Sequence, residues 1–181
     1  MKRLIFPLFG LCALLLVACN TPIAAREITE IEATPGPLPQ DPPASCPITQ
    51  PPDPAFTPPE PYPAVAPYGE FWYGTNELWT MVQPDGRWVA LPHDESGYGQ
   101  KIFLWREGYD MTTENQPQIA MSGRRLDGAE TFTGPTGGTN GYHGDMGQFM
   151  LTGVSIPTVG CWEITGQYRD ATLSFVVWVA P

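Results

Sequence analysis

The sequence from about Tyr68 to Pro181 predicts an all-β fold, a sandwich or a barrel. Aromatic and β-branched residues gather there in short segments, and Gly, Asn, Asp and Pro separate these segments. No long window repeats its apolar residues with the helical period. The length of this part is normal for a single domain.

The predicted strands are short, as expected for a β-sandwich. The turn QPDG at 83–86 supports two of them, because proline presets φ and glycine accepts a positive φ. The strands are expected at 70–74, 77–83, 86–91, 100–107, 118–126, 148–155, 160–168 and 171–179.

The last two segments form the best-defined hairpin. In GCWEITGQY, Trp162 and Ile164 share one face, whereas Cys161 lies on the other face, because side chains alternate along a strand. We therefore expect Trp162 in the core and Cys161 on the outer face. In the following strand the expected core residues are Leu173, Phe175, Val177 and Val179, with Val176 and Trp178 opposite.

Residues 127–147 are rich in glycine and nearly free of aliphatic side chains. A surface loop, or a pair of loops, is expected there. Loops on a rigid scaffold often carry binding sites, although the length also fits a connection without function.

Residues 20–67 hold most of the 22 prolines in the chain. Proline lacks the N–H donor and restricts the preceding residue, which predicts an extended, polyproline-like spacer. The expected tether therefore covers residues 19–67. A proline-rich ligand for a groove-type receptor is the alternative.

The N-terminus has the layout of a secretory signal peptide. Lys2 and Arg3 precede an apolar stretch that is short for a membrane span. LVAC at 16–19 resembles the lipobox of bacterial lipoproteins. The resemblance implies removal of residues 1–18 and attachment of lipid, such as palmitate, to Cys19. A simple secreted protein and an uncleaved anchor are the alternatives.

The cysteines and the charge fit an exported protein. A net charge of −10 argues against nucleic-acid binding. Cys12 falls in the removed segment, so Cys46 and Cys161 remain as a pair beside Cys19, and we expect a disulfide between them. Two free thiols or an intermolecular bond are the alternatives. With this bridge the second half of the spacer would lie strapped along the domain, leaving only about 20–45 as a loose tether.

The C-terminal stretch GDMGQFMLTGVSIPTVGCWEITGQYRDATLSFVVWV, with FWYGTNELWT upstream, resembles the ends of immunoglobulin-like domains in bacterial envelope lipoproteins. A Pro-x-x-Gly corner precedes a strand with a buried aromatic in such domains. The resemblance implies a single immunoglobulin-like β-sandwich at 68–181 and an envelope setting, without catalytic residues. The chain lacks the paired inter-sheet cysteines of true immunoglobulin domains.

No catalytic motif is recognisable in the sequence. His93 and His143 each have a nearby carboxylate, but neither shows a zinc-ligand spacing, and no calcium loop or GxSxG elbow occurs. We therefore expect no catalytic residues, no metal and no cofactor. A composite metal site from both histidine loops is the less favoured alternative.

The aromatic residues suggest two kinds of role. They could fill a small core, or they could form a stacking platform for a glycan. The candidate binding surface consists of Trp72, Tyr73, Trp79, Trp105, Tyr142, His143 and Asp145.

The sequence therefore predicts a lipid-anchored, monomeric envelope protein on the cytoplasmic membrane or the outer membrane. Its domain would have a non-catalytic binding or accessory role. An envelope protein or a glycan would be its partner. A glycan-binding module and an unrecognised envelope hydrolase are the alternatives.

Overall fold

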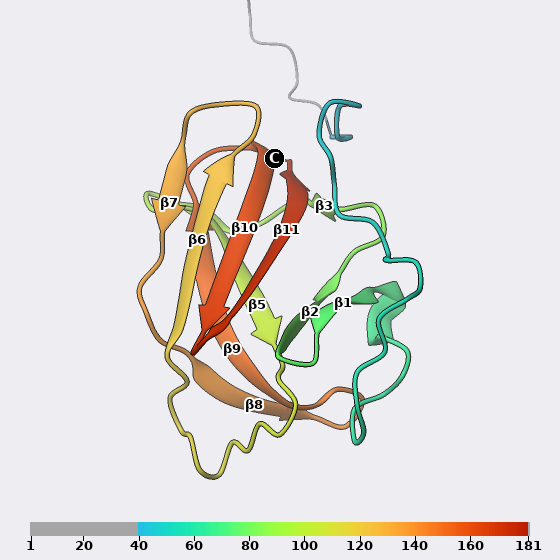
Figure 1. The fold of residues 1–181 in the computed structure, drawn as a ribbon. Helices are drawn as coiled ribbons and strands as arrows, with labels where there is room; N and C mark the ends of the chain where they lie inside the picture. Colours follow the sequence, from blue (N-terminus) through green and yellow to red (C-terminus); the bar gives the residue numbers. More distant parts are fainter. Residues whose placement is uncertain (1–39, 181) are drawn as a thin grey trace, which may run out of the picture. The chain divides into compact units, whose positions relative to one another are not determined.

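The computed structural model describes residues 40–180. Within them the fold is all-β and sandwich-like, with eleven strands and no α-helix (Figure 1). Cys12, Cys19 and the expected signal peptide lie outside the described residues.

Two sheets face each other, and a hairpin flanks them (Figure 1). The five-stranded sheet has the order β3 (Arg87–Trp88), β11 (Ala171–Val179), β10 (Gly160–Tyr168), β6 (Ile119–Arg125), β7 (Thr131–Thr133). The four-stranded sheet has the order β4 (His93–Asp94), β5 (Gly97–Leu104), β9 (Gly147–Ile156), β8 (Thr139–His143). The hairpin consists of β1 (Phe71–Thr75) and β2 (Leu78–Val82), preceded by the 3-10 turn Pro67–Gly69.

The core between the sheets follows from the alternation in the β10–β11 hairpin. Trp162 pairs with Val177 and Ile164 with Phe175, and all four side chains are buried in the main core. Trp162 also donates a hydrogen bond from Nε1 to the Thr158 carbonyl at 2.9 Å. The predicted faces of this hairpin are therefore confirmed.

The outer face of the same hairpin carries the disulfide. Cys46 and Cys161 are bonded, with the two sulfur atoms 2.01 Å apart. Cys161 points away from the main core, as predicted, yet only 1% of it is exposed, because the N-terminal segment covers it together with Trp178 and Ala180.

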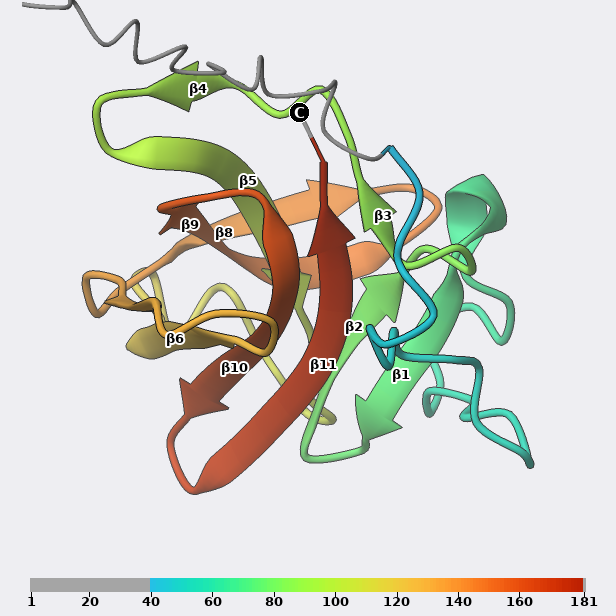
Figure 2. The ribbon, with the colours of Figure 1, turned by 90° about the horizontal axis from the view of Figure 1, so that it is seen from above.

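Residues 40–66, which we call the strap, run along the domain from this disulfide (Figure 2). Thr49 exchanges hydrogen bonds with the backbone of Val176 in β11, at 3.0 and 2.7 Å. Asp41 forms an ion pair of 2.9 Å with Arg87 in β3. Further on, Tyr62 packs edge-on against Trp79 of β2, with ring centroids 5.2 Å apart. The folded part therefore begins before Tyr68, among residues that the sequence assigns to the tether.

The glycine-rich region departs from the expectation of loops. It contains the short strands β7 and β8, which extend the two sheets. Aromatic rings lie over glycines at both pairings, Phe132 over Gly123 and Phe149 over Gly141. Sequence patterning missed these strands because both are short and nearly free of aliphatic side chains. The sequence also predicted no strand at the position of β4. It predicted a strand at 86–91, where β3 has only two residues.

Candidate functional site: a cleft between the sheets

The tryptophans of the candidate binding surface are buried, which agrees with the first of the two roles open to the aromatic residues, filling a small core. The exposed fractions of Trp72, Trp79 and Trp105 are 3%, 0% and 0%. Trp72 and Trp105 meet edge-on with ring centroids 5.0 Å apart, and the strap covers this cluster through Tyr62. These rings stabilise the attachment of the strap and present no face to a ligand.

The remaining predicted residues lie elsewhere. Tyr73 is half-buried against the main core. Tyr142 is 67% exposed at the end of β8, and His143 and Asp145 follow it, with Nδ1 and Oδ2 3.8 Å apart. Tyr142 and Asp145 line a shallow hollow of about 630 Å³ with prolines of the strap.

The two histidines are not brought together. His93 lies on β4 and His143 on β8, which are the opposite edges of the four-stranded sheet. Within residues 40–180, no group of three or more His, Cys, Asp or Glu side chains could hold a metal ion.

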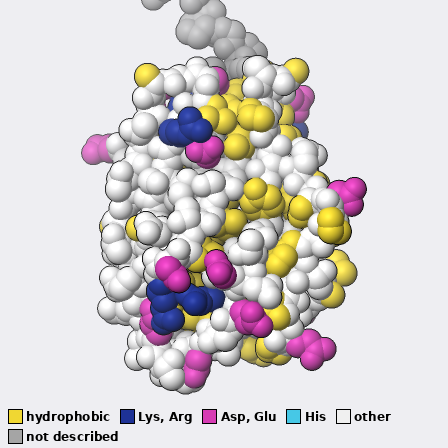
Figure 3. Space-filling view, in the orientation of Figure 1, with side chains coloured by type: hydrophobic (Ala, Val, Ile, Leu, Met, Phe, Trp, Pro, Cys, Tyr) yellow, Lys and Arg dark blue, Asp and Glu magenta, His cyan; other side chains and the backbone are white. Residues whose placement is uncertain are grey.

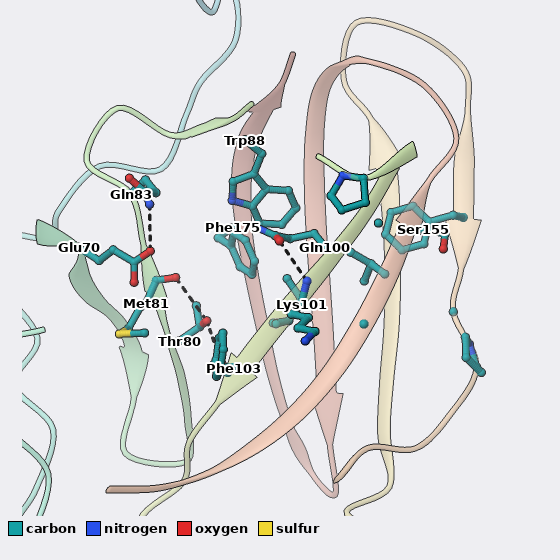
Figure 4. A pocket seen from close by; sticks show the side chains of 18 of the residues that line it. Glu70, Thr80, Met81, Gln83, Trp88, Gln100, Lys101, Phe103, Ser155 and Phe175 are labelled. Carbon is teal, nitrogen blue, oxygen red and sulfur yellow. Dashed lines mark hydrogen bonds between the residues drawn. The ribbon is translucent and has the colours of Figure 1, made fainter. Parts of the chain in front are cut away.

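A cleft of about 840 Å³ lies between the two sheets. Its walls come from β2, β3, β5, β7, β9 and β11, and Figure 4 shows the side chains around it. We call this cavity the inter-sheet cleft.

The cleft opens where β2 and β5 diverge. Trp79 and Trp105 exchange two backbone hydrogen bonds of 3.0 Å, which join β2 to the end of β5. Beyond this bridge no pairing joins the two strands among the residues described. At the other end of β5, β4 pairs only with Gly97 and Tyr98. One edge of β5 therefore borders the cleft between these two attachments.

The interior of the cleft is apolar. Ile102, Val154 and Phe175 are buried in its walls, and Trp88 and Phe132 are half-buried beside them. The rings of Trp88 and Phe175 meet edge-on with centroids 6.1 Å apart. Such a lining is typical of sites for small organic ligands.

Polar side chains gather at the mouth of the cleft. Gln83 Nε2 donates to Glu70 Oε1 at 3.2 Å (Figure 4). Burial raises the pKa of Glu70 above its ordinary value, and this hydrogen bond acts in the opposite direction. On β5, Gln100 Oε1 accepts the backbone N–H of Lys101 at 3.1 Å.

Lys101 differs from the other cations of the domain. Each arginine within residues 40–180 has a carboxylate at 2.6–3.6 Å: Arg87 with Asp41, Arg106 with Asp170, Arg124 with Glu163, Arg125 with Asp127, Arg169 with Glu114. On the face shown in Figure 3, the basic side chains accordingly adjoin acidic ones. The ammonium group of Lys101 has no ion pair or hydrogen bond with any residue described. Lys101 is also the one cation of the described part of the chain that lines the cleft.

No protein-family model, no curated protein and no solved structure matches this chain.

Sequence reasoning missed the cleft residues. One signal was present in QKIFLW at 100–105. There Gln100 shares the face of Ile102 and Leu104, which point into the core. A polar residue on an otherwise apolar, core-facing row indicates a place where the core opens.

Proposed function

We propose that this protein is a lipid-anchored bacterial envelope protein whose immunoglobulin-like domain binds a ligand, without catalysis, in the inter-sheet cleft. The apolar cleft of about 840 Å³ with an unpaired lysine at its mouth carries this proposal. An enclosed apolar surface of this size is a common feature of ligand sites.

The immunoglobulin-like assignment draws support from the sandwich-like arrangement and from the corner before β10. Pro157 and Gly160 frame a turn, and Gly160 has a φ of 141°, which favours glycine. The buried Trp162 follows it, as in the resemblance drawn from the sequence.

The envelope setting rests on two observations. The disulfide is typical of proteins outside the cytoplasm. The lipobox-like residues at 16–19 suggest that lipid on Cys19 attaches the domain to a membrane. Among residues 40–180, no helix has the length and apolar character to cross a bilayer. We propose a monomer as the working form.

The glycan-binding alternative loses its main support because the candidate tryptophans are buried. Tyr68 and Tyr142, each 67% exposed, are the large aromatic side chains left at the surface. They do not build a stacking row with the tryptophans.

A blocking variant tests whether the cleft binds a native ligand. Thr133 and Thr131 are both exposed on β7, but only Thr133 lines the cleft. We expect that Thr133→Trp fills the mouth, whereas Thr131→Trp leaves it open. The full-length protein and both variants would be extracted from the cell envelope under mild conditions, and co-purifying molecules would be identified by mass spectrometry.

The expected result is a ligand that co-purifies with the parent protein and with Thr131→Trp, but not with Thr133→Trp. Equal recovery from both variants, or no co-purifying molecule at all, would contradict binding in the cleft.

A further inference from the structure

We infer that the inter-sheet cleft takes a monoanionic amphiphile, whose carboxylate lies at Lys101 and whose apolar body lies between the sheets. This inference rests on the proposed function of the cleft as a binding site, and it specifies the chemistry of the ligand.

The charge at the mouth indicates an anionic head group. The chain has a net charge of −10, and each arginine described has a carboxylate partner, yet Lys101 remains unpaired beside the cleft. A carboxylate on the ligand would give Lys101 the kind of ion-pair partner that each arginine described already has. Gln100 adds a second donor, because its Oε1 is occupied by the Lys101 N–H while its amide nitrogen has no hydrogen-bond partner within residues 40–180.

The mouth favours one negative charge over two. Among residues 40–180, Lys101 is the only cation that lines the cleft, and Glu70 places a carboxyl group on the same lining. Lysine also acts as a point charge without the planar fork with which arginine binds phosphate. A dianionic phosphate would therefore be less well matched than a carboxylate.

The walls indicate an apolar body of limited size. Phe103 and Lys101 point to one face of β5, and Ile102 to the other, and all three line the cleft. The cleft therefore passes around the edge of β5 from solvent to the buried residues Val154 and Phe175. An acyl chain can follow this path while the head group stays at the edge.

An added peptide strand fits this edge less well, because three of the backbone groups along it already have partners. The Gly99 N–H donates to the Pro92 carbonyl at 2.8 Å, and the Phe103 carbonyl accepts from Thr80 Oγ1 at 2.8 Å. The Lys101 N–H donates to the Gln100 side chain. Strand addition requires free groups of this kind.

Calorimetric titration of the full-length protein with decanoate, decanol and decylamine tests the inference, with each ligand kept below its aggregation concentration. We expect decanoate to bind about tenfold more tightly than decanol, because a charge-assisted hydrogen bond stabilises the head group. Decylamine should bind most weakly. Lys101→Gln should remove the preference for decanoate and leave the binding of decanol unchanged. Arg124→Gln, which removes an exposed cation away from the cleft, is the matched control and should retain the preference.

Equal affinity for decanoate and decanol, or a preference that survives Lys101→Gln, would overturn the inference while leaving the cleft as a binding site. A peptide recovered as the native ligand would also overturn it. If the native ligand is lost in Thr133→Trp but decanoate does not bind, the inference fails and the proposed function stands. If none of the three probes binds and Thr133→Trp changes nothing in the co-purification, both fail together.

Discussion

Glu114 connects three parts of the chain through one side chain. Its Oε2 accepts hydrogen bonds from the Tyr168 hydroxyl at 2.5 Å and from Arg169 at 2.6 Å. Its backbone carbonyl accepts from Asn140, and Tyr109 donates to the same carbonyl and to the Asn140 side chain. The residues around 110–118 have no regular secondary structure, so this network fixes them against β8 and β10.

This network predicts a loss of stability at alkaline pH. Burial, followed by the charge of Glu114, raises the pKa of Tyr109 to about 12, and the pKa of Tyr168 is raised as well. A raised phenol pKa means that the fold favours the neutral form. The stabilisation is therefore complete below the ordinary value of 10.0 and is lost as the pH rises toward about 12.

Urea denaturation across this pH range, combined with the absorbance of phenolate, measures the effect. Glu114→Gln should shift the late phenolate titration to lower pH. Tyr142→Phe, which changes an exposed side chain outside the network, should leave the alkaline loss of stability unchanged. A free energy of unfolding that stays constant between pH 10 and about 12 would contradict the prediction.

At the level of elements, the strap acts as an outer layer of the sandwich. It covers the disulfide at one end and the Trp72–Trp79–Trp105 cluster at the other. Trp72 Nε1 also donates to the Pro63 carbonyl at 2.9 Å. A proline-rich segment suits this role, because it has little conformational freedom to lose and does not need a ladder of backbone hydrogen bonds.

Removing the disulfide should therefore weaken the attachment of the strap. The bridge closes a sequence separation of 115 residues, for which loop-closure entropy gives about 5 kcal/mol of stability. We expect the double variant Cys46→Ser/Cys161→Ser to lose about this much in chemical denaturation. Reducing agent should destabilise the parent protein and leave the double variant unaffected. Equal stability of the two proteins would show that the bridge contributes nothing.

For the whole molecule, we propose a folded domain that lipid on Cys19 holds at a membrane, because residues 16–19 resemble a lipobox. Two acyl chains anchor a protein far more firmly than one, since each buried methylene contributes about 0.8 kcal/mol. The residues between Cys19 and the strap would then set the distance between the domain and the membrane.

Cys19→Ser tests this arrangement in cells. The variant should accumulate as an uncleaved precursor without incorporated palmitate, because the modified thiol is the expected signal for processing. Metabolic labelling with palmitate and cell fractionation give the readout. Cys12→Ser, which changes a cysteine within the expected signal peptide, is the matched control and should be processed normally. Normal maturation of the Cys19 variant would contradict the lipoprotein assignment.

Local sequence signals predicted much of the fold. The boundaries of β10 and β11 agree with the segments 160–168 and 171–179, because strict alternation and a short turn define a hairpin from neighbouring residues. The disulfide was also predictable, since few cysteines remain once the N-terminal ones are assigned. The sequence left two roles open for Trp72, Trp79 and Trp105, and the structure decided for burial, because the strap that covers their face lies far away in the sequence.

The sequence alone determined the all-β class, the main strands, the faces of the last hairpin and the cysteine pair. These properties depend on residue type, alternation and turn chemistry, which act over a few residues. The tertiary structure decided which residues the strap contacts, the short strands β7 and β8 and the inter-sheet cleft. The cleft exists because β2 and β5 separate beyond a single bridge at Trp79 and Trp105. Within residues 40–180, Lys101 lacks an ion-pair partner whereas each arginine has one. Ion pairs between residues far apart in the sequence leave no periodic signal along the chain.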